Sequence, residues 1–182
     1  MMVHLTRIYT KTGDSGYTSL ADGTRIMKSL PILEAIGAVD EANSAVGMVF
    51  SVAKVEPNVE SILKIIQNDL FDVGARLSSA RVITITPKKA AFLEELIDFY
   101  NEKLKTLDSF VLPSGNAAGS LLHNARTAVR RAEREVHKAM IGLDTDNSDV
   151  VIYLNRLSDL LFVLARYVNG EDEILWVPGG KE

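Results

Sequence analysis

Four polar side chains share one stripe of a predicted helix and lie beside its apolar face. They recur every three or four residues, a spacing that keeps them on one side of a helix. Two arginines one turn apart offer planar, permanently charged donors that suit phosphate oxygens, so the stripe predicts an anion-binding face. The alternative is a solvated face, on which Arg–Glu pairs stabilise the helix by only about 0.2–0.5 kcal/mol. The four residues are Arg126, Arg130, Glu133 and His137.

Two other predicted helices also place polar residues among small or apolar ones. A buried carboxylate without a partner is costly, so we expect Asp40 to pair with an arginine of the helix that carries Arg126. Two alternatives remain: the small residues only let another helix approach closely, or the polar groups satisfy one another in the core. The two sets are Gly37, Asp40, Ser44 and Gly47, and Asn155, Asp159, Phe162 and Arg166.

The N-terminal stretch of residues 6–29 is rich in glycine and hydroxyl side chains and has no helical period. It predicts an ordered loop with a short strand at either end. Glycine and hydroxyl residues around Lys11 can turn successive backbone N–H groups toward an anion. The stretch lacks the G-x-x-x-x-G-K-[ST] pattern of a Walker A loop. It is therefore either a phosphate-binding loop of another kind or an ordinary surface loop.

Several other chemistries find no support in the sequence. The chain has no cysteine, which excludes thiol nucleophiles, disulfides and cysteine-based metal sites. His123 and His137 lie 14 residues apart, about 21 Å along a helix, too far to share a metal. A di-iron bundle needs two Glu-x-x-His motifs, whereas Glu133 and His137 are four residues apart and form the one similar pair. Any reaction must therefore proceed without a familiar nucleophile from the protein.

The composition is that of an ordinary globular protein. Of 182 residues, 47% are hydrophobic and 24% charged, both near the averages for such proteins. This length predicts one domain, residues 1–182. A net charge of −4 argues against a nucleic-acid binder. Without a secretory signal or a run of 18 apolar residues, we expect a cytoplasmic protein with no membrane contact.

Five amphipathic stretches follow the loop, and several have recognisable ends. Ser29 is a candidate cap for the first, and Thr86 with Pro87 for the third; Ser148 and Gly170 flank the fifth. Short connections and inward apolar stripes predict an all-α, five-helix bundle with an extended tail at residues 173–177. The predicted helices span residues 31–55, 58–79, 87–107, 116–141 and 149–169.

Three blocks of the sequence carry a resemblance to a known family. They are residues 9–20 (YTKTGDSGYTSL) with 23–28 (GTRIMK), residues 37–44 (GAVDEANS), and residues 110–115 (FVLPSG) with 125–134 (ARTAVRRAER) and 153–159 (YLNRLSD). Together they extend over nearly the whole chain. The combination of the loop with an Arg-x-x-x-Arg-Arg-x-Glu helix is highly specific. Through these blocks the chain resembles the PduO-type ATP:cob(I)alamin adenosyltransferases.

This resemblance implies a ferritin-like, cobalamin adenosyltransferase-like five-helix bundle that forms a homotrimer with active sites between subunits. The implied reaction transfers the 5′-deoxyadenosyl group of ATP to the cobalt of cob(I)alamin, releasing triphosphate and forming adenosylcobalamin. ATP and cob(I)alamin are then substrates and Mg²⁺ accompanies the triphosphate. A reductase and an adenosylcobalamin-dependent enzyme are implied partners. Because Co(I) is itself a strong nucleophile, the protein needs to supply only binding, orientation and electrostatics.

The resemblance also implies roles for individual residues. Asp40 is the partner of Arg126 across the subunit interface, and Phe110 is the aromatic residue at the lower face of the corrin; these three form the implied catalytic set. The implied nucleotide contacts are Thr10, Lys11, Thr12, Gly13, Asp14, Gly16, Lys28, Arg126, Arg130, Glu133 and Asn155.

Two alternatives compete with this interpretation. A non-catalytic bundle could act as a scaffold or as a sensor that binds ATP without chemistry, and a different nucleotide-dependent transferase could use the same bundle. A scaffold needs neither the loop nor the arginine stripe. A sensor needs the ATP site but not Phe110.

Overall fold

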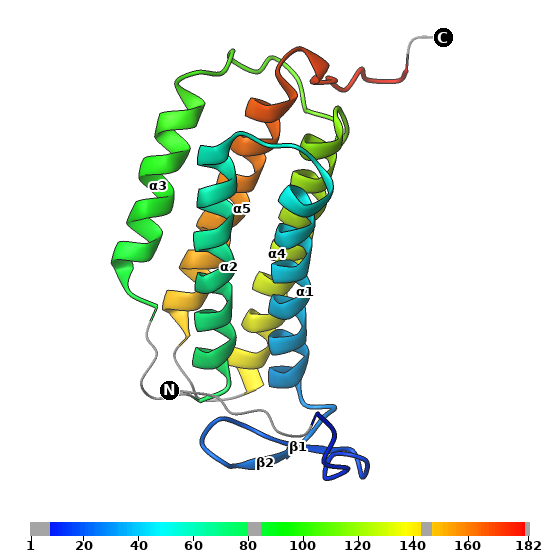
Figure 1. Ribbon diagram of the computed structural model, residues 1–182, viewed down its shortest axis with the longest axis vertical. Coiled ribbons are helices and arrows are strands. Elements are labelled where there is room, and N and C mark those ends of the chain that lie inside the picture. The colour runs from blue at the N-terminus through cyan, green and yellow to red at the C-terminus, as the bar shows by residue number, and fades with distance from the viewer. Residues whose placement is uncertain (1–7, 80–84, 143–146, 181–182) are drawn as a thin grey trace.

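Five α-helices run up and down a bundle in the part of the chain that the structure describes (Figure 1). This computed structural model describes residues 8–79, 85–142 and 147–180. The five-helix bundle predicted from the sequence is confirmed. The helices are α1 (Pro31–Val52), α2 (Pro57–Leu77), α3 (Pro87–Asn101), α4 (Ala117–Gly142) and α5 (Ser148–Asn169), followed by a short 3₁₀-helix η1 (Gly170–Asp172).

Proline determines where three of the helices begin. Pro31, Pro57 and Pro87 each stand in the first turn, where a missing N–H costs no hydrogen bond. The residue before a proline is held in the extended region, so Leu30, with φ −72° and ψ 144°, takes the cap position of α1. The prediction of Ser29 as that cap is therefore wrong.

Other predicted helix ends also differ from those observed. Thr86 holds the cap position of α3, as predicted, but makes no side-chain capping bond. The cap position of α5 is Asn147 rather than Ser148. Three helices end earlier than predicted, α1 at Val52, α2 at Leu77 and α3 at Asn101, because the chain there turns toward the next element. Gly170, with φ +51°, ends α5 as predicted.

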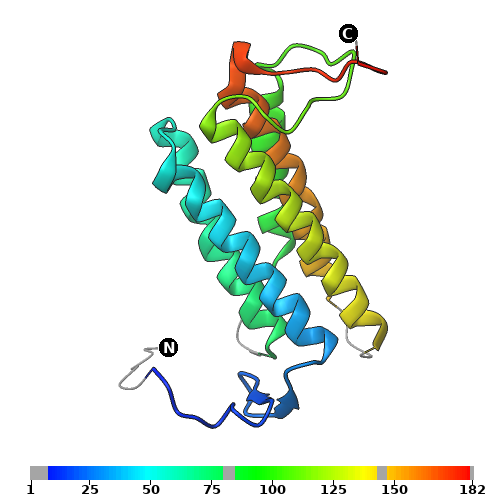
Figure 2. The same ribbon diagram turned by 90° about the vertical axis from the view of Figure 1, so that its right-hand side faces the viewer.

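A short hairpin lies beneath the end of the bundle at which α1 begins (Figures 1 and 2). Its strands β1 (Tyr17–Ser19) and β2 (Arg25–Met27) pair antiparallel, with Thr18 opposite Ile26. β2 lies near the C-terminal end of the predicted loop, as expected, whereas β1 lies in its middle; residues 6 and 7 lie outside the described chain. The N–H of Ala21 donates to the carbonyl oxygen of Ser78 at 2.9 Å, which fastens the hairpin to the end of α2.

The core lies among α1, α2, α4 and α5, while α3 packs on the outside against α5 (Figure 1). The apolar arc predicted for α4 is buried, including Leu122, Val129 and Val136. Full burial of such side chains contributes about 1.5–3 kcal/mol each. This arc fixes the rotation of α4 and so determines where its polar stripe points. Among the described residues, no helix has the length and apolar character that a membrane crossing requires.

Candidate active site

Arg126 and Arg130 lie near the middle of α4. The helix has 26 residues and is thus about 39 Å long. The Arg126 side chain is half-buried, and its Nε atom has no hydrogen-bond partner among the described residues. Burial and the neighbouring charge of Arg130 both lower the pKa of Arg126, although a guanidinium remains protonated at neutral pH. Two adjacent cations, one of them partly desolvated and incompletely bonded, form a site suited to an anion.

Glu133 and Asn155 meet beside these arginines. The Asn155 amide nitrogen donates to Glu133 Oε1 at 3.3 Å, which joins α4 to α5. Both residues are half-buried, and Glu133 follows Arg130 by three positions on the same side of α4. The structure therefore brings four of the predicted nucleotide contacts together in the middle of the bundle: Arg126, Arg130, Glu133 and Asn155.

His123 also lies at this part of α4, although the sequence analysis did not include it in the site. Its ring is buried, and neither ring nitrogen has a partner among the described residues. The ring faces Phe162 of α5, with 6.2 Å between centroids. Burial and the charge of Arg126 lower the pKa of His123, against the opposing effect of Glu173. Its position one turn before Arg126 is the sequence signal that could have indicated it.

Asp40 lies on the outward face of α1 and is exposed. No hydrogen bond or ion pair joins it to Arg126 within the described chain, so a single chain does not form the expected pair. The reason is the rotation of α1: Ala38, Val39 and Ala42 face the core, which turns Asp40 outward. Pairing across a subunit interface remains a prediction.

The predicted residues of the N-terminal loop lie together at the hairpin end of the bundle. Lys11 has φ +59° and Gly16 has φ +83°, so the chain turns sharply at both. The Lys28 N–H donates to the Gly16 carbonyl oxygen at 2.8 Å, and the Lys28 Nζ lies 3.0 Å from where a Cβ on Gly13 would stand. The loop thus places one cation beside Gly13. The residues it gathers are Thr10, Lys11, Thr12, Gly13, Asp14, Gly16 and Lys28.

The segment that leads from α3 into α4 lies at the opposite end of the bundle from the hairpin (Figures 1 and 2), and Phe110 belongs to this segment. Its side chain is 76% exposed. Arg126 and Arg130 lie between the two ends, at mid-helix. A single chain therefore does not bring the N-terminal loop and Phe110 to the same place.

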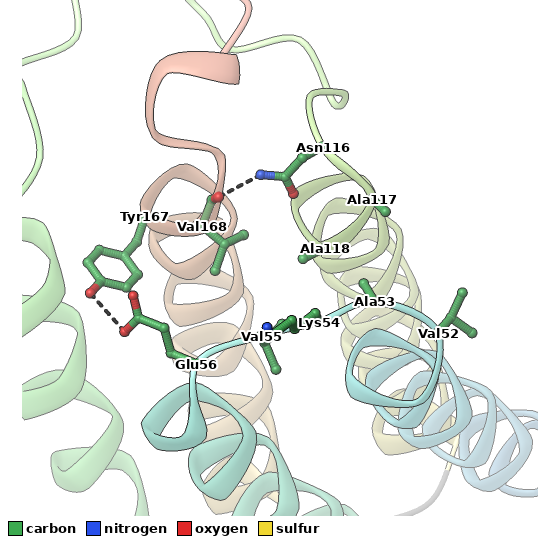
Figure 3. A pocket seen from close by; sticks show the side chains of 10 residues that line it. All are labelled: Val52, Ala53, Lys54, Val55, Glu56, Asn116, Ala117, Ala118, Tyr167 and Val168. Carbon is green, nitrogen blue, oxygen red and sulfur yellow. Dashed lines mark hydrogen bonds between the residues drawn. The ribbon is translucent and has the colours of Figure 1, made fainter.

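A cavity of about 440 Å³ opens near the Phe110 end, between the α1–α2 connection, the start of α4 and the end of α5 (Figure 3). Its polar groups already bond one another. The Tyr167 hydroxyl donates to Glu56 Oε2 at 3.1 Å, and the Asn116 amide nitrogen donates to the Val168 carbonyl oxygen at 2.6 Å. None of the predicted site residues lines this cavity.

A family model, curated relatives and solved structures all match this chain over most of its length, and all are cobalamin or corrinoid adenosyltransferases. A family model described as cobalamin adenosyltransferase matches residues 8–168. The corrinoid adenosyltransferase of Mycobacterium leprae is 43% identical over 99% of this chain and 100% of its own length. Among solved structures, a variant PduO-type ATP:corrinoid adenosyltransferase from Lactobacillus reuteri complexed with cobalamin and ATP is 36% identical. It superimposes with a TM-score of 0.85 over 93% of this chain and 99% of its own. A second variant of that enzyme, complexed with ATP, is 38% identical, with a TM-score of 0.86 over 93% and 100% of the two chains.

Proposed function

The chain belongs to the cobalamin adenosyltransferase family, and on that premise we propose how its residues carry out the transfer. The protein is an ATP:corrinoid adenosyltransferase, an enzyme that takes ATP and a corrinoid as substrates. Its reaction joins the 5′-deoxyadenosyl group of ATP to Co(I). The Co(I) electron pair attacks C5′ of the ribose, the C5′–O bond breaks, and triphosphate leaves with the bonding electrons.

The protein's principal contribution is to stabilise the charge that develops on the leaving triphosphate. Arg126 and Arg130 bind its oxygens, while Glu133 and Asn155 supply an acceptor and a donor in a fixed arrangement. The observation that supports this assignment is the half-buried Arg126, whose Nε has no hydrogen-bond partner among the described residues and whose neighbour is a second cation. Donors positioned before the reaction stabilise such charge without reorganising.

The N-terminal loop holds the remainder of the nucleotide, through Lys11 and Lys28 and through backbone N–H groups. Mg²⁺ enters with the triphosphate. The described residues contain no group of three or more acidic or histidine side chains that could hold a metal. That fits an ion bound chiefly by phosphate oxygens and water, which is how Mg²⁺ commonly binds nucleotides.

The active site is completed by a second copy of the chain, and the assembly is a homotrimer. Three observations support the contribution of a second copy. The loop and Phe110 lie at opposite ends of one bundle (Figure 1), and Asp40 is exposed on α1. In addition, a groove of about 440 Å³ runs between α1 and α4, lined in part by Ser44, Met48 and Arg134. A neighbouring subunit on this face would bring its own residues to the middle of α4.

The remaining assignments follow from the same reaction. Residues 1–182 form a single cobalamin adenosyltransferase domain located in the cytoplasm. A reductase supplies the electron that converts Co(II) to Co(I), and an adenosylcobalamin-dependent enzyme receives the product.

Anaerobic incubation of the protein with ATP, Mg²⁺ and chemically reduced cobalamin tests the function directly. We expect the light-sensitive spectrum of adenosylcobalamin and one triphosphate for each adenosyl group transferred. ATP binding without either product would instead favour the sensor, and failure to bind ATP would favour a scaffold.

Asp40 and Arg126 are expected to be coupled across the subunit interface. Removal of one partner from a buried ion pair costs about 3–5 kcal/mol, because the other charge is left unpaired. A double-mutant cycle with Asp40→Asn and Arg126→Ala should give an interaction energy of about 0.5–3 kcal/mol, measured on activity and on the trimer–monomer equilibrium by sedimentation.

The exposed pair Glu60–Lys64 on α2 provides a control, because both residues belong to one chain and their side chains form an ion pair there, with 2.6 Å between Lys64 Nζ and Glu60 Oε1. Glu60→Gln should change neither activity nor assembly. Additive effects of the Asp40 and Arg126 substitutions, with an unchanged oligomer, would exclude the pairing.

A further inference from the structure

The segment that carries Phe110 is paired with the C-terminal tail. Residues 109–112 and 173–177 run antiparallel, and we call them the C-terminal ladder. The Trp176 N–H donates to the Phe110 carbonyl oxygen at 2.7 Å, and the Leu112 N–H donates to the Ile174 carbonyl oxygen at 2.8 Å. The Ser109 hydroxyl donates to the Trp176 carbonyl oxygen at 2.7 Å. The Phe110 and Trp176 rings lie 6.0 Å apart between centroids. The tail is thus the immediate neighbour of Phe110.

A buried arginine of α5 holds the tail strand of the ladder and the chain that leads to the other strand. Arg166 is 6% exposed. Its Nε donates to Glu173 Oε1 at 2.7 Å, and its Nη2 donates to Glu173 Oε2 at 3.3 Å. The same Nη2 donates to the Lys105 carbonyl oxygen at 2.9 Å. One guanidinium therefore holds the tail through Glu173 and the Phe110 segment through the backbone of Lys105.

Asn169 fixes the other end of the Phe110 segment. Its amide nitrogen donates to the Ser114 carbonyl oxygen at 2.8 Å, and its Oδ1 accepts the Asn116 N–H at 3.0 Å. A Cβ atom at Gly115 would stand 2.3 Å from that Oδ1, and a Cβ atom at Gly119 would stand 2.0 Å from it. This close approach therefore requires glycine at both positions. The backbone between Lys105 and Ser114 is therefore held at its two ends by side chains of α5, Arg166 at Lys105 and Asn169 at Ser114.

Phe110 itself has little else to hold it. At 76% exposure its ring is outside the core, so its orientation depends on the ladder and on Trp176. Of the contacts that fix the ladder, the Arg166–Glu173 pair is the charge-assisted and bidentate one, the strongest class of hydrogen bond.

We propose that Glu173 is a positioning residue, which through Arg166 and the C-terminal ladder sets the Phe110 ring against the corrin. This inference rests on the proposed function and on the role that the family resemblance implies for Phe110, at the lower face of the corrin. Glu173 does not touch the reacting atoms. It determines whether the tail is docked, and the docked tail determines where Phe110 stands.

The tail can be observed directly, because Trp176 is the sole tryptophan of the chain. Glu173→Gln keeps the size of the side chain and removes its charge, so the equilibrium between docked and released tail should shift toward release roughly tenfold or more. Acrylamide quenching of Trp176 fluorescence, without substrates, should therefore increase. The affinity for ATP should remain unchanged, while turnover that starts from cob(II)alamin should fall.

Glu171→Gln is the matched control. Glu171 lies two positions before Glu173 and forms an ion pair with Lys105 at 3.5 Å, in which both side chains are at least 90% exposed. The Glu171→Gln substitution should leave both the quenching of Trp176 fluorescence and the turnover at wild-type values. Glu173→Asp, which keeps the charge, should recover part of the loss.

Unchanged quenching in Glu173→Gln, or increased quenching with normal turnover, would overturn the proposal.

If Glu173→Gln lowers the melting temperature, Trp176→Ala tests the same link without leaving Arg166 unpaired. It should reproduce the kinetic defect with ATP affinity intact, and wild-type kinetics would overturn the proposal. A wild-type protein that forms no adenosylcobalamin from cob(I)alamin would refute the proposed function, and with it this role of Phe110. An active wild type with an unaffected variant would refute the positioning alone.

Discussion

Arg130→Ala is expected to lower kcat/KM for ATP by roughly 10²–10³-fold, the usual cost of removing one donor that stabilises transition-state charge. The free energy of unfolding should change by no more than about 0.5 kcal/mol, because surface substitutions rarely cost more. Arg130 is exposed, so its removal leaves no cavity and no unpaired partner. A large catalytic loss with little loss of stability is the signature of a substrate contact.

The measurement combines steady-state kinetics with thermal unfolding, and Lys138→Ala is the control. Lys138 lies on the same helix and also carries one positive charge, but it pairs with Glu135 at 2.6 Å in an exposed i,i+3 contact. If both variants lose activity equally, the effect reflects the general charge of α4 and not a contact with triphosphate. If Arg130→Ala shows wild-type kinetics, Arg130 is a solvated helix residue and does not contact triphosphate.

The sequence predicts the architecture well because the helix signals are local. Pro31, Pro57 and Pro87 fix three helix starts, and the apolar arc of α4 sets its rotation. That rotation in turn places Arg126 at the edge of the core, as the spacing predicts. These features depend on residues a few positions apart, which a single sequence contains.

Asp40 shows where such reasoning stops. Periodicity indicates that Asp40 shares a stripe with small residues, but it does not indicate whether that stripe meets the core, solvent or another chain. The core-facing positions of α1 are taken by Ala38 and Val39, so Asp40 turns outward. A partner that belongs to a second copy has no signal in the periodicity of one chain.

Arg166 shows a second limit of the sequence. Helical spacing places it on a face with Asn155 and Phe162, which suggests a residue of the functional site. Its actual partner is Glu173, and the two meet because Gly170 and η1 fold the chain back after α5. The pair depends on the geometry of that turn, and the result is an anchor for the tail rather than a ligand for phosphate.

Phe110→Ala is the second substitution with a large expected effect, and its effect should depend on the oxidation state of the cobalt supplied. The family resemblance implies that the ring lies at the lower face of the corrin, and we propose that it excludes a lower axial ligand, which would otherwise make reduction of Co(II) harder. Axial ligation is a main determinant of the potential of such metals. Each 59 mV or so of potential lost corresponds to about a tenfold lower Co(I)/Co(II) ratio. Turnover from cob(II)alamin with a weak reductant should therefore fall steeply.

The variant should bind ATP normally, because the contact implied for Phe110 is with the corrin, whereas the implied nucleotide contacts are residues of the N-terminal loop, α4 and α5. It should also fold normally. A hydrophobic staple for α4 is the alternative role, but the ring is 76% exposed and packs against Trp176. Phe71→Ala provides the control, since Phe71 is 71% exposed on α2 and has no place in the proposed site.

Calorimetry with ATP, thermal unfolding, and anaerobic assays begun from cob(II)alamin and from pre-reduced cob(I)alamin together decide the role of Phe110. The defect should shrink when cob(I)alamin is supplied, because the difficult electron transfer has then already occurred. Equal losses from the two oxidation states would mean that the ring binds the corrin without preparing its reduction. A lower melting temperature than that of Phe71→Ala would instead mean that Phe110 stabilises the C-terminal ladder. The predicted pattern, normal ATP affinity and stability with a larger loss of turnover from Co(II) than from Co(I), is one that neither a packing residue nor a simple binding residue can produce.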